Sequence, residues 1–290
     1  MKLKRILGKS EQPRRAWREA PSSPPPGANP QSNTPPDLAN RRRFLERHIL
    51  IHTHVPKTAG STLSHALAGI VGGANAIDLR LRRAVRLREL STEDRAGLRC
   101  ISGHFVYGLH TRFDQIPLYM AAIREPVSRA ISDFRFNLRN PNHRDHARLQ
   151  GTSFEEAWDL VTGKAAHARY NEQSRILCGL ASEVQPTREM LLQRLENDYF
   201  LIIPQQHMGM AIRDLRAAFG LPWTKIPLMN PAQGPEVEIT AAMRDKVRAA
   251  NQLDIELCDR VEAAFPARLA RACAYIAENC LRDRGREDQA

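Results

Sequence analysis

Residues 49–71, ILIHTHVPKTAGSTLSHALAGIV, predict a buried strand followed by a tight loop and a helix. The apolar run at 49–51 is typical of a short buried strand. The loop spans 55–62, and Ser61 or Thr62 is placed to cap the helix start. Apolar residues then recur at helical spacing, at Leu63, Leu67, Ile70 and Val71.

This strand–loop–helix unit predicts an anion site. The first-turn N–H groups of a helix have no partner within the helix, and the helix dipole adds partial positive charge there. Lys57 adds a full charge, and Ser61 and Thr62 add hydroxyl donors, which suits a phosphate or a phosphosulfate. The loop is not a Walker A motif, because Lys57 precedes Gly60 instead of following the second glycine.

Composition predicts one folded domain behind a basic tail. The 290 residues are 42% hydrophobic, enough to bury a substantial core. Residues 1–50 carry +7 of the formal net charge of +11, so the basic balance describes the tail and does not imply nucleic-acid binding. We expect a disordered, proline-rich tail at 1–43 and the domain at 44–290. The tail is expected to be solvated, with weak contact to an anionic membrane surface as the alternative.

Three further features bound the class of protein. The five cysteines are odd in number and form no C-x-x-C, which argues against a disulfide framework or a zinc site. There is no run of eighteen apolar residues and no apolar segment behind the basic N-terminus, so we expect neither a membrane span nor a secretory signal. These features favour a cytoplasmic protein.

Two more predicted strands end in polar motifs. One covers 99–103 and ends at His104, and the other covers 118–123 and ends at Arg124, with Pro126 suited to the first turn of the next helix. Ligands bind outside the carboxyl ends of parallel strands. We therefore expect Lys57, His104 and Arg124 to converge at one edge of the sheet.

The predicted fold class is α/β, with P-loop-like α/β/α layers around a central parallel sheet and a mostly helical C-terminal half. Helical spacing and apolar runs predict helices at 154–162, 171–180, 187–197 and 207–219, a strand at 199–203, a loop at 222–235, and long helices at 240–264 and 266–284. An arginine-rich segment at 80–88 is interpreted as a solvated face, with a basic rim for an anionic acceptor as the alternative.

Two motifs resemble those of sulfotransferases that use 3′-phosphoadenosine 5′-phosphosulfate (PAPS). Residues 56–63, PKTAGSTL, resemble the family's 5′-phosphosulfate loop. Residues 124–134, REPVSRAISDF, resemble its 3′-phosphate element, in which an arginine and a serine eight residues later hold the 3′-phosphate. The matches span about 50–264 and are closest to the carbohydrate branch, which includes the uronyl 2-O-sulfotransferases and bacterial members.

The resemblance implies roles for individual residues. Gly103-His104-Phe105 matches the family motif whose histidine is the catalytic base, and a pKa of about 6.5 suits an imidazole to that task. Lys57 would stabilise the leaving oxygen, and residues 170–179, YNEQSRILCG, resemble a segment lining the active site. The PAPS-binding set implied is Lys57, Thr58, Ala59, Gly60, Ser61, Thr62, Arg124 and Ser132, and the acceptor-binding set is His110, Asn171, Gln173 and Arg175.

Three alternatives stay open at this point. His52, His54 and His110 compete with His104 for the role of base. A P-loop kinase or nucleotide phosphotransferase fits the strand–loop–helix unit, although the lysine is misplaced and a strand-end aspartate for Mg²⁺ is not evident. A non-catalytic anion-binding module is the other rival. The resemblance implies a hydroxyl acceptor on a saccharide or glycolipid, and no metal.

Overall fold

The structure is a computed structural model that describes residues 38–79, 90–162, 170–224, 237 and 239–281. The arginine-rich segment at 80–88 lies outside these residues, and so does the part of the basic tail that was expected to contact an anionic membrane surface. Helix α1 (Leu38–Arg47) begins six residues before the predicted domain start at 44. Asn40 and Phe44 of this helix are buried, so its contacts with the domain explain the earlier start.

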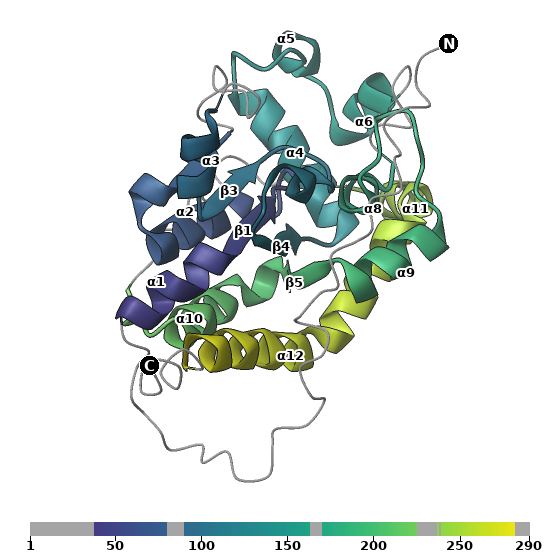
Figure 1. The fold of residues 1–290 in the computed structure, drawn as a ribbon. Coiled ribbons are helices and arrows are strands. Elements are labelled where there is room, and N and C mark those ends of the chain that lie inside the picture. The colour runs from purple at the N-terminus through teal and green to yellow at the C-terminus, as the bar shows by residue number, and fades with distance from the viewer. Residues whose placement is uncertain (1–37, 80–89, 163–169, 225–236, 238, 282–290) are drawn as a thin grey trace, which may run out of the picture. The chain divides into compact units, whose positions relative to one another are not determined.

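The described strands form one parallel sheet in the order β2-β3-β1-β4-β5. Their bounds are β1 His48–Thr53, β2 Ala76–Asp78, β3 Cys100–Gly103, β4 Ile116–Ile123 and β5 Tyr199–Pro204. Helices pack around the sheet (Figure 1), so the α/β class and the central parallel sheet are confirmed. The arrangement is consistent with three α/β/α layers.

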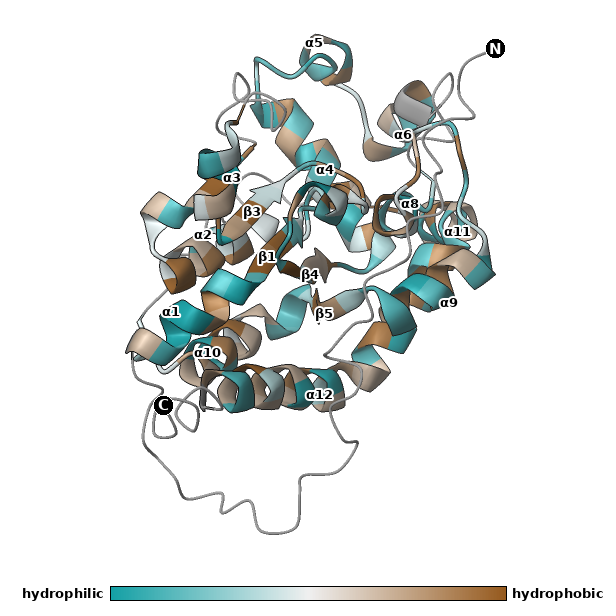
Figure 2. Ribbon diagram, in the orientation of Figure 1, coloured by the Kyte–Doolittle hydropathy of each residue, from teal (hydrophilic) through white to brown (hydrophobic). Residues whose placement is uncertain are grey.

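The strands lie in the sheet because their sequences suit burial on both faces. Every residue of β1, β3 and β5 is buried. Parallel strands covered by helices are typically continuous apolar runs, and Ile49-Leu50-Ile51 and Phe200-Leu201-Ile202-Ile203 have that character. Figure 2 shows the hydrophobic colour concentrated on β1 and β4.

The helices account for most of the remaining described chain. Their bounds are α2 Gly60–Val71, α3 Thr92–Gly97, α4 Pro126–Arg139, α5 His146–Leu149, α6 Phe154–Thr162, α8 Glu172–Cys178, α9 Arg188–Asn197, α10 Met208–Ala218, α11 Ala241–Ala250 and α12 Gln252–Leu281. The predicted helices from 154 to 219 and the strand at 199–203 are confirmed within a few residues. None of the described helices combines the length and the apolar character needed to cross a bilayer.

The two predicted C-terminal helices divide at a different place. Pro266 lies inside α12, and the break falls at Asn251. The Asn251 side-chain amide donates to the Val247 carbonyl at 2.8 Å, which caps α11. The Asn171 side-chain oxygen accepts from the Leu253 backbone N–H at 2.9 Å, which starts α12. Placing the break at Pro266 was wrong, because these side-chain caps determine the helix ends.

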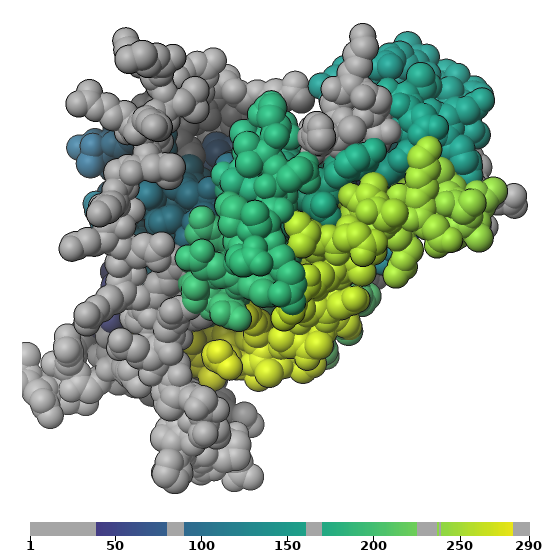
Figure 3. All heavy atoms as spheres, turned by 90° about the vertical axis from the view of Figure 1, so that its right-hand side faces the viewer, coloured from purple at the N-terminus to yellow at the C-terminus, as the bar shows by residue number. Residues whose placement is uncertain are grey.

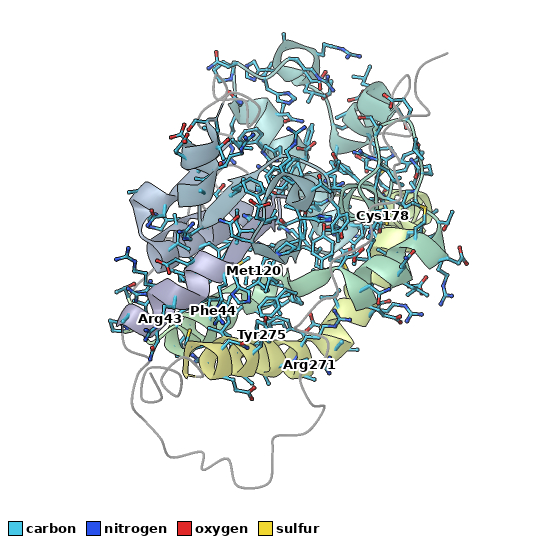
Figure 4. All side chains as sticks on the ribbon, viewed as in Figure 1. Arg43, Phe44, Met120, Cys178, Arg271 and Tyr275 are labelled. Atoms are coloured by element: carbon cyan, nitrogen blue, oxygen red, sulfur yellow. The ribbon has the colours of Figure 1, made fainter. Side chains whose placement is uncertain are left out.

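Helix α12 ties the C-terminal half to the first strand. His48 Nε2 lies 2.9 Å from the Tyr275 hydroxyl, and the His48 ring stacks on Phe44 with centroids 4.0 Å apart. Figure 4 shows Phe44 and Tyr275 on neighbouring elements near Met120. Farther along, α8 contacts both α9 and α12, and Figure 3 shows α9, α11 and α12 on one face of the molecule.

Candidate functional site

The candidate site begins where β1 and β3 end next to each other in the sheet. In the parallel register Thr53 lies opposite both Gly103 of β3 and Ala121 of β4. His54 follows β1, and its backbone N–H donates to the Gly103 carbonyl at 2.9 Å. His104 therefore leaves the sheet next to the loop that leads to Lys57, at the strand edge where parallel sheets bind ligands.

The loop between β1 and α2 has an uncommon backbone conformation. Lys57 and Ala59 have φ values of 68° and 64°, in the left-handed region that residues other than glycine seldom adopt. The Thr58 hydroxyl donates to the Val55 carbonyl at 2.9 Å and fixes the turn. Backbone strain of this kind clusters at ligand clamps and active sites. The loop thus has the character of a binding site.

The start of α2 differs from the prediction. Ala59 is the N-cap residue, and no side chain caps the helix. The Thr62 backbone N–H donates to the Ala59 carbonyl at 3.0 Å. The prediction that Ser61 or Thr62 caps α2 is wrong, because the left-handed turn at Ala59 starts the helix earlier. The helix dipole still favours an anion at this end.

Lys57 lies among other cations and against an aromatic ring. Its Nζ is 3.8 Å from the centroid of Phe136 on α4, a distance typical of a cation–π contact. Burial is the largest cause of its lowered pKa, about 8. The charges of Arg139 and Arg124 lower this pKa further, and Asp133 raises it. Clustered cations that disfavour each other's charge favour a bound anion.

Arg124 is held at the end of β4 by its backbone. Gln173 accepts from the Arg124 N–H at 2.9 Å and donates to the Arg124 carbonyl at 2.8 Å. The guanidinium reaches the loop, where NH1 donates to the Lys57 carbonyl at 3.4 Å. Burial lowers the pKa of Arg124, with the cations of Arg135 and Arg129 adding to the effect and Glu125 opposing it. The structure thus brings two predicted elements, 67 residues apart, into contact.

Helix α4 presents Ser132 toward the same loop. Pro126 is its first residue, as predicted, and Glu125 caps it by accepting from the N–H groups of Val127 at 3.0 Å and Ser128 at 2.7 Å. Residues four apart on a helix share a face. Because Phe136 contacts Lys57, half-buried Ser132 lies on the face of α4 that adjoins the loop.

His104 has a defined hydrogen bond and is exposed. Its Nδ1 lies 3.0 Å from the backbone carbonyl of His54, which can only accept, so Nδ1 carries the proton in the neutral ring. The basic lone pair then belongs to Nε2. An exposed imidazole oriented through Nδ1 in this way is suited to general-base chemistry.

His54 is a residue of the site whose place the sequence did not reveal. Its buried ring stacks on His104 with centroids 4.5 Å apart and on His52 at 5.3 Å. A Cβ on Gly60 would lie 2.2 Å from His54 Cδ2, so glycine at 60 makes room for the ring. His52 is 0% exposed and His54 is 5% exposed, so an acceptor hydroxyl has little access to either ring. Both are therefore less suited than His104 to act as the base. The alternation His52-x-His54 and the glycine at 60 were the available signals.

His110, another rival for the base, is engaged by a buried tyrosine. Its Nδ1 and its backbone N–H lie 3.2 Å and 3.0 Å from the Tyr119 hydroxyl. That hydroxyl also accepts from the Gly108 N–H at 3.2 Å. Burial raises the pKa of Tyr119 far above its usual range, so the hydroxyl keeps its proton. These contacts give the half-buried His110 ring a role in shaping the loop after β3.

The predicted acceptor-binding residues of α8 make protein contacts. Asn171 caps α12, as described above, and Gln173 is fully buried against Arg124. Arg175 is 6% exposed, and its guanidinium donates to the Leu180 carbonyl at 3.3 Å. In the structure these three side chains form hydrogen bonds to backbone groups of the protein. They therefore hold α8, α12 and Arg124 in place.

Neither a metal site nor a known family is found for the part of the chain that the structure describes and for the sequence, respectively. Across them, no group of three or more His, Cys, Asp or Glu side chains could hold a metal ion. No protein-family model matches the chain, and a search of curated proteins found no matching relative. The geometry of Lys57, Arg124 and His104 is therefore what supports a function.

Proposed function

We propose that the chain is a sulfotransferase that moves the sulfuryl group of PAPS to a hydroxyl of a saccharide or glycolipid. One observation carries the proposal: the guanidinium of Arg124 contacts the backbone of the Lys57 loop, while His104 leaves the sheet beside that loop. An anion cradle next to an oriented imidazole suits transfer of an anionic group to a hydroxyl. The P-loop-like character of the fold belongs to this proposal.

In the proposed reaction each residue has a separate task. His104 Nε2 takes the proton of the acceptor hydroxyl as its oxygen bonds to sulfur, and the bond from sulfur to the 5′-phosphate oxygen breaks in line. Lys57 and the N-terminus of α2 stabilise the charge left on that oxygen. Arg124 and Ser132 hold the 3′-phosphate, and the released product is 3′-phosphoadenosine 5′-phosphate (PAP).

Calorimetric titration of PAP and ADP tests this assignment. Arg124→Ala is expected to weaken PAP binding by about 10- to 100-fold, because a hydrogen bond to a charged group contributes about 1.5–3 kcal/mol. ADP lacks the 3′-phosphate, so its affinity should be lower in the wild type and change little in the variant. Arg213→Ala on α10 removes an exposed arginine, whereas Arg124 is half-buried, and serves as the control.

Equal affinity of the wild type for PAP and ADP would overturn the 3′-phosphate assignment. Tighter binding of ADP together with Mg²⁺ would favour the phosphotransferase alternative. Strong PAP binding without turnover on any hydroxyl acceptor would instead favour a binding module. An unchanged PAP preference in Arg124→Ala would remove Arg124 from the site.

The affinity for PAP is also expected to fall with rising pH. Burial lowers the pKa of Lys57 to about 8, so the ammonium is present at pH 7 and mostly lost at pH 9. If PAP binds the protonated form, its dissociation constant should rise about tenfold across this interval. The phosphates of PAP are ionised by pH 7, since their second pKa is about 6.

Lys57→Arg is the control for this pH dependence, because arginine keeps its charge through pH 9. The variant is expected to show a nearly flat profile in calorimetric titrations at pH 7, 8 and 9. The same tenfold loss in both proteins would show that a group other than Lys57 titrates.

A further inference from the structure

One side of α4 adjoins the Lys57 loop and carries two arginines that have no task in the proposed reaction. Its residues recur at three- and four-residue intervals, which places their side chains on one side of a helix. Phe136 fixes the direction of this side, because its ring centroid lies 3.8 Å from Lys57 Nζ. We call it the loop face of α4, and its members are Ser132, Arg135, Phe136 and Arg139.

The two arginines of the loop face act on different cations of the proposed nucleotide site. Burial is the largest cause of the lowered pKa of Arg124, and the charge of Arg135 lowers this pKa further. Burial likewise lowers the pKa of Lys57, and there the added effect comes from Arg139. Charges influence each other in this way only at short range. Arg135 is therefore a neighbour of Arg124, and Arg139 a neighbour of Lys57.

Arg135 has no carboxylate partner within the described part of the chain. Its Nε is buried and donates to no acceptor there, and its guanidinium forms no ion pair with a described residue. Other arginines of this region are paired: Arg129 donates to Glu172 at 2.7 Å, for example. A half-buried guanidinium beside a second one is disfavoured unless an anion lies near both. The arrangement of Arg135 and Arg124 thus indicates an anionic ligand.

The 3′-phosphate of the proposed nucleotide calls for more than one cation. A phosphate monoester carries about two negative charges above its second pKa of about 6. The groups assigned to it so far are Arg124, which supplies one positive charge, and the neutral hydroxyl of Ser132. Arg135 follows Ser132 by three residues on the loop face, so both can contact one ligand. A guanidinium at 135 would complete the opposite charge.

We infer that Arg135 is a second guanidinium for the 3′-phosphate and helps to determine the preference for nucleotides that carry this group. Arg124 belongs to the end of β4 and Arg135 to α4, so a phosphate bound by both is held from two elements. The planar fork of each guanidinium suits phosphate oxygens. The inference rests on the proposed sulfuryl transfer for the identity of the nucleotide.

Arg139 provides a comparison on the same helix. It is exposed, and its charge acts on Lys57 at the proposed 5′-phosphate. Removal of Arg139 should therefore weaken every nucleotide that has a 5′-phosphate. Removal of Arg135 should weaken only those that have a 3′-phosphate. The two arginines lie about one helical turn apart, so loss of one positive charge from α4 is common to both variants.

Calorimetric titration of the full chain with PAP and with adenosine 5′-phosphate tests the inference, because these nucleotides differ only in the 3′-phosphate. The wild type is expected to bind PAP about 100-fold more tightly, with two arginines contributing. Arg135→Gln should weaken PAP binding about tenfold and leave adenosine 5′-phosphate within about twofold. Arg139→Gln should weaken both nucleotides by a similar factor and so keep the preference.

Two further variants complete the test. Arg135→Lys keeps the charge and loses the planar fork, so it should retain part of the PAP preference that Arg135→Gln loses. It keeps the inference testable if circular dichroism shows that Arg135→Gln folds poorly. Arg144→Gln removes an exposed arginine that lies 3.5 Å from Asp145, beyond the end of α4. This control should bind both nucleotides as the wild type does.

Two results would overturn the inference alone. They are an unchanged PAP preference in Arg135→Gln while Arg124→Ala lowers that preference, and an equal loss of both nucleotides in Arg135→Gln. A wild type that binds PAP and adenosine 5′-phosphate equally would instead refute the 3′-phosphate assignment of the proposed function, and the role of Arg135 with it. Selective loss of PAP in Arg135→Gln, with partial recovery in Arg135→Lys, would support the inference.

Discussion

His104→Asn is expected to lower the turnover of PAPS by about 10²- to 10⁴-fold, the usual contribution of a general base. Asparagine retains a donor for the His54 carbonyl, which His104 Nδ1 contacts at 3.0 Å, but it cannot take up a proton. Because the side chain of His104 lies beside the anion loop and not in it, PAP affinity should stay within about twofold. The measurement is PAP release with a mixture of saccharide acceptors.

Two other histidine variants sharpen this test. His65→Asn, on the exposed face of α2, should match the wild type in both rate and affinity. His110→Asn tests the rival base, whose ring contacts the Tyr119 hydroxyl at 3.2 Å, and should lower the rate by a few-fold at most. A larger loss in His110→Asn than in His104→Asn would reverse the assignment.

The sequence reveals the central strands better than the edge of the sheet. β1, β4 and β5 contain apolar runs long enough to show burial on both faces. β2 is three residues long and half-buried, so Ala76-Ile77-Asp78 shows no pattern that separates it from a loop. Its place in the sheet comes from pairing with β3, which a local pattern does not encode.

The candidate site divides in the same way. Lys57, His104 and Arg124 are each found at the end of a predicted strand, and a parallel sheet brings strand ends together. What the sequence cannot show is how Arg124 is held, because Gln173 lies 49 residues away. The close fit of His54 on Gly60 likewise depends on the fold of the loop.

Asp254 is the most consequential of these distant contacts. It is fully buried near the start of α12, where Oδ1 accepts from the Ser174 N–H and hydroxyl, both at 2.7 Å, and Oδ2 accepts from the Gln173 N–H at 3.1 Å. It therefore binds the first turn of α8, whose Gln173 side chain holds Arg124. One carboxylate links the C-terminal helix to the proposed phosphate site.

Asp254→Ala is expected to lower the free energy of unfolding by about 3–5 kcal/mol, because it strands three buried donors and deprives Arg129 of a nearby opposite charge. Urea denaturation monitored by circular dichroism measures this loss. Asp259→Ala, an exposed aspartate on the same helix, is the matched control and should change stability by less than about 0.5 kcal/mol.

Asp254→Asn separates the hydrogen bonds from the charge. Its remaining oxygen can still accept from Ser174, so the variant should recover part of the stability lost in alanine. Gln173 should keep its position better in the Asp254→Asn protein than in the Asp254→Ala protein. The PAP affinity of the Asp254→Asn protein should therefore be closer to that of the wild type. Equal stability of the Asp254→Ala and Asp259→Ala proteins would mean that α8 is held by packing, and that the carboxylate does not position Arg124.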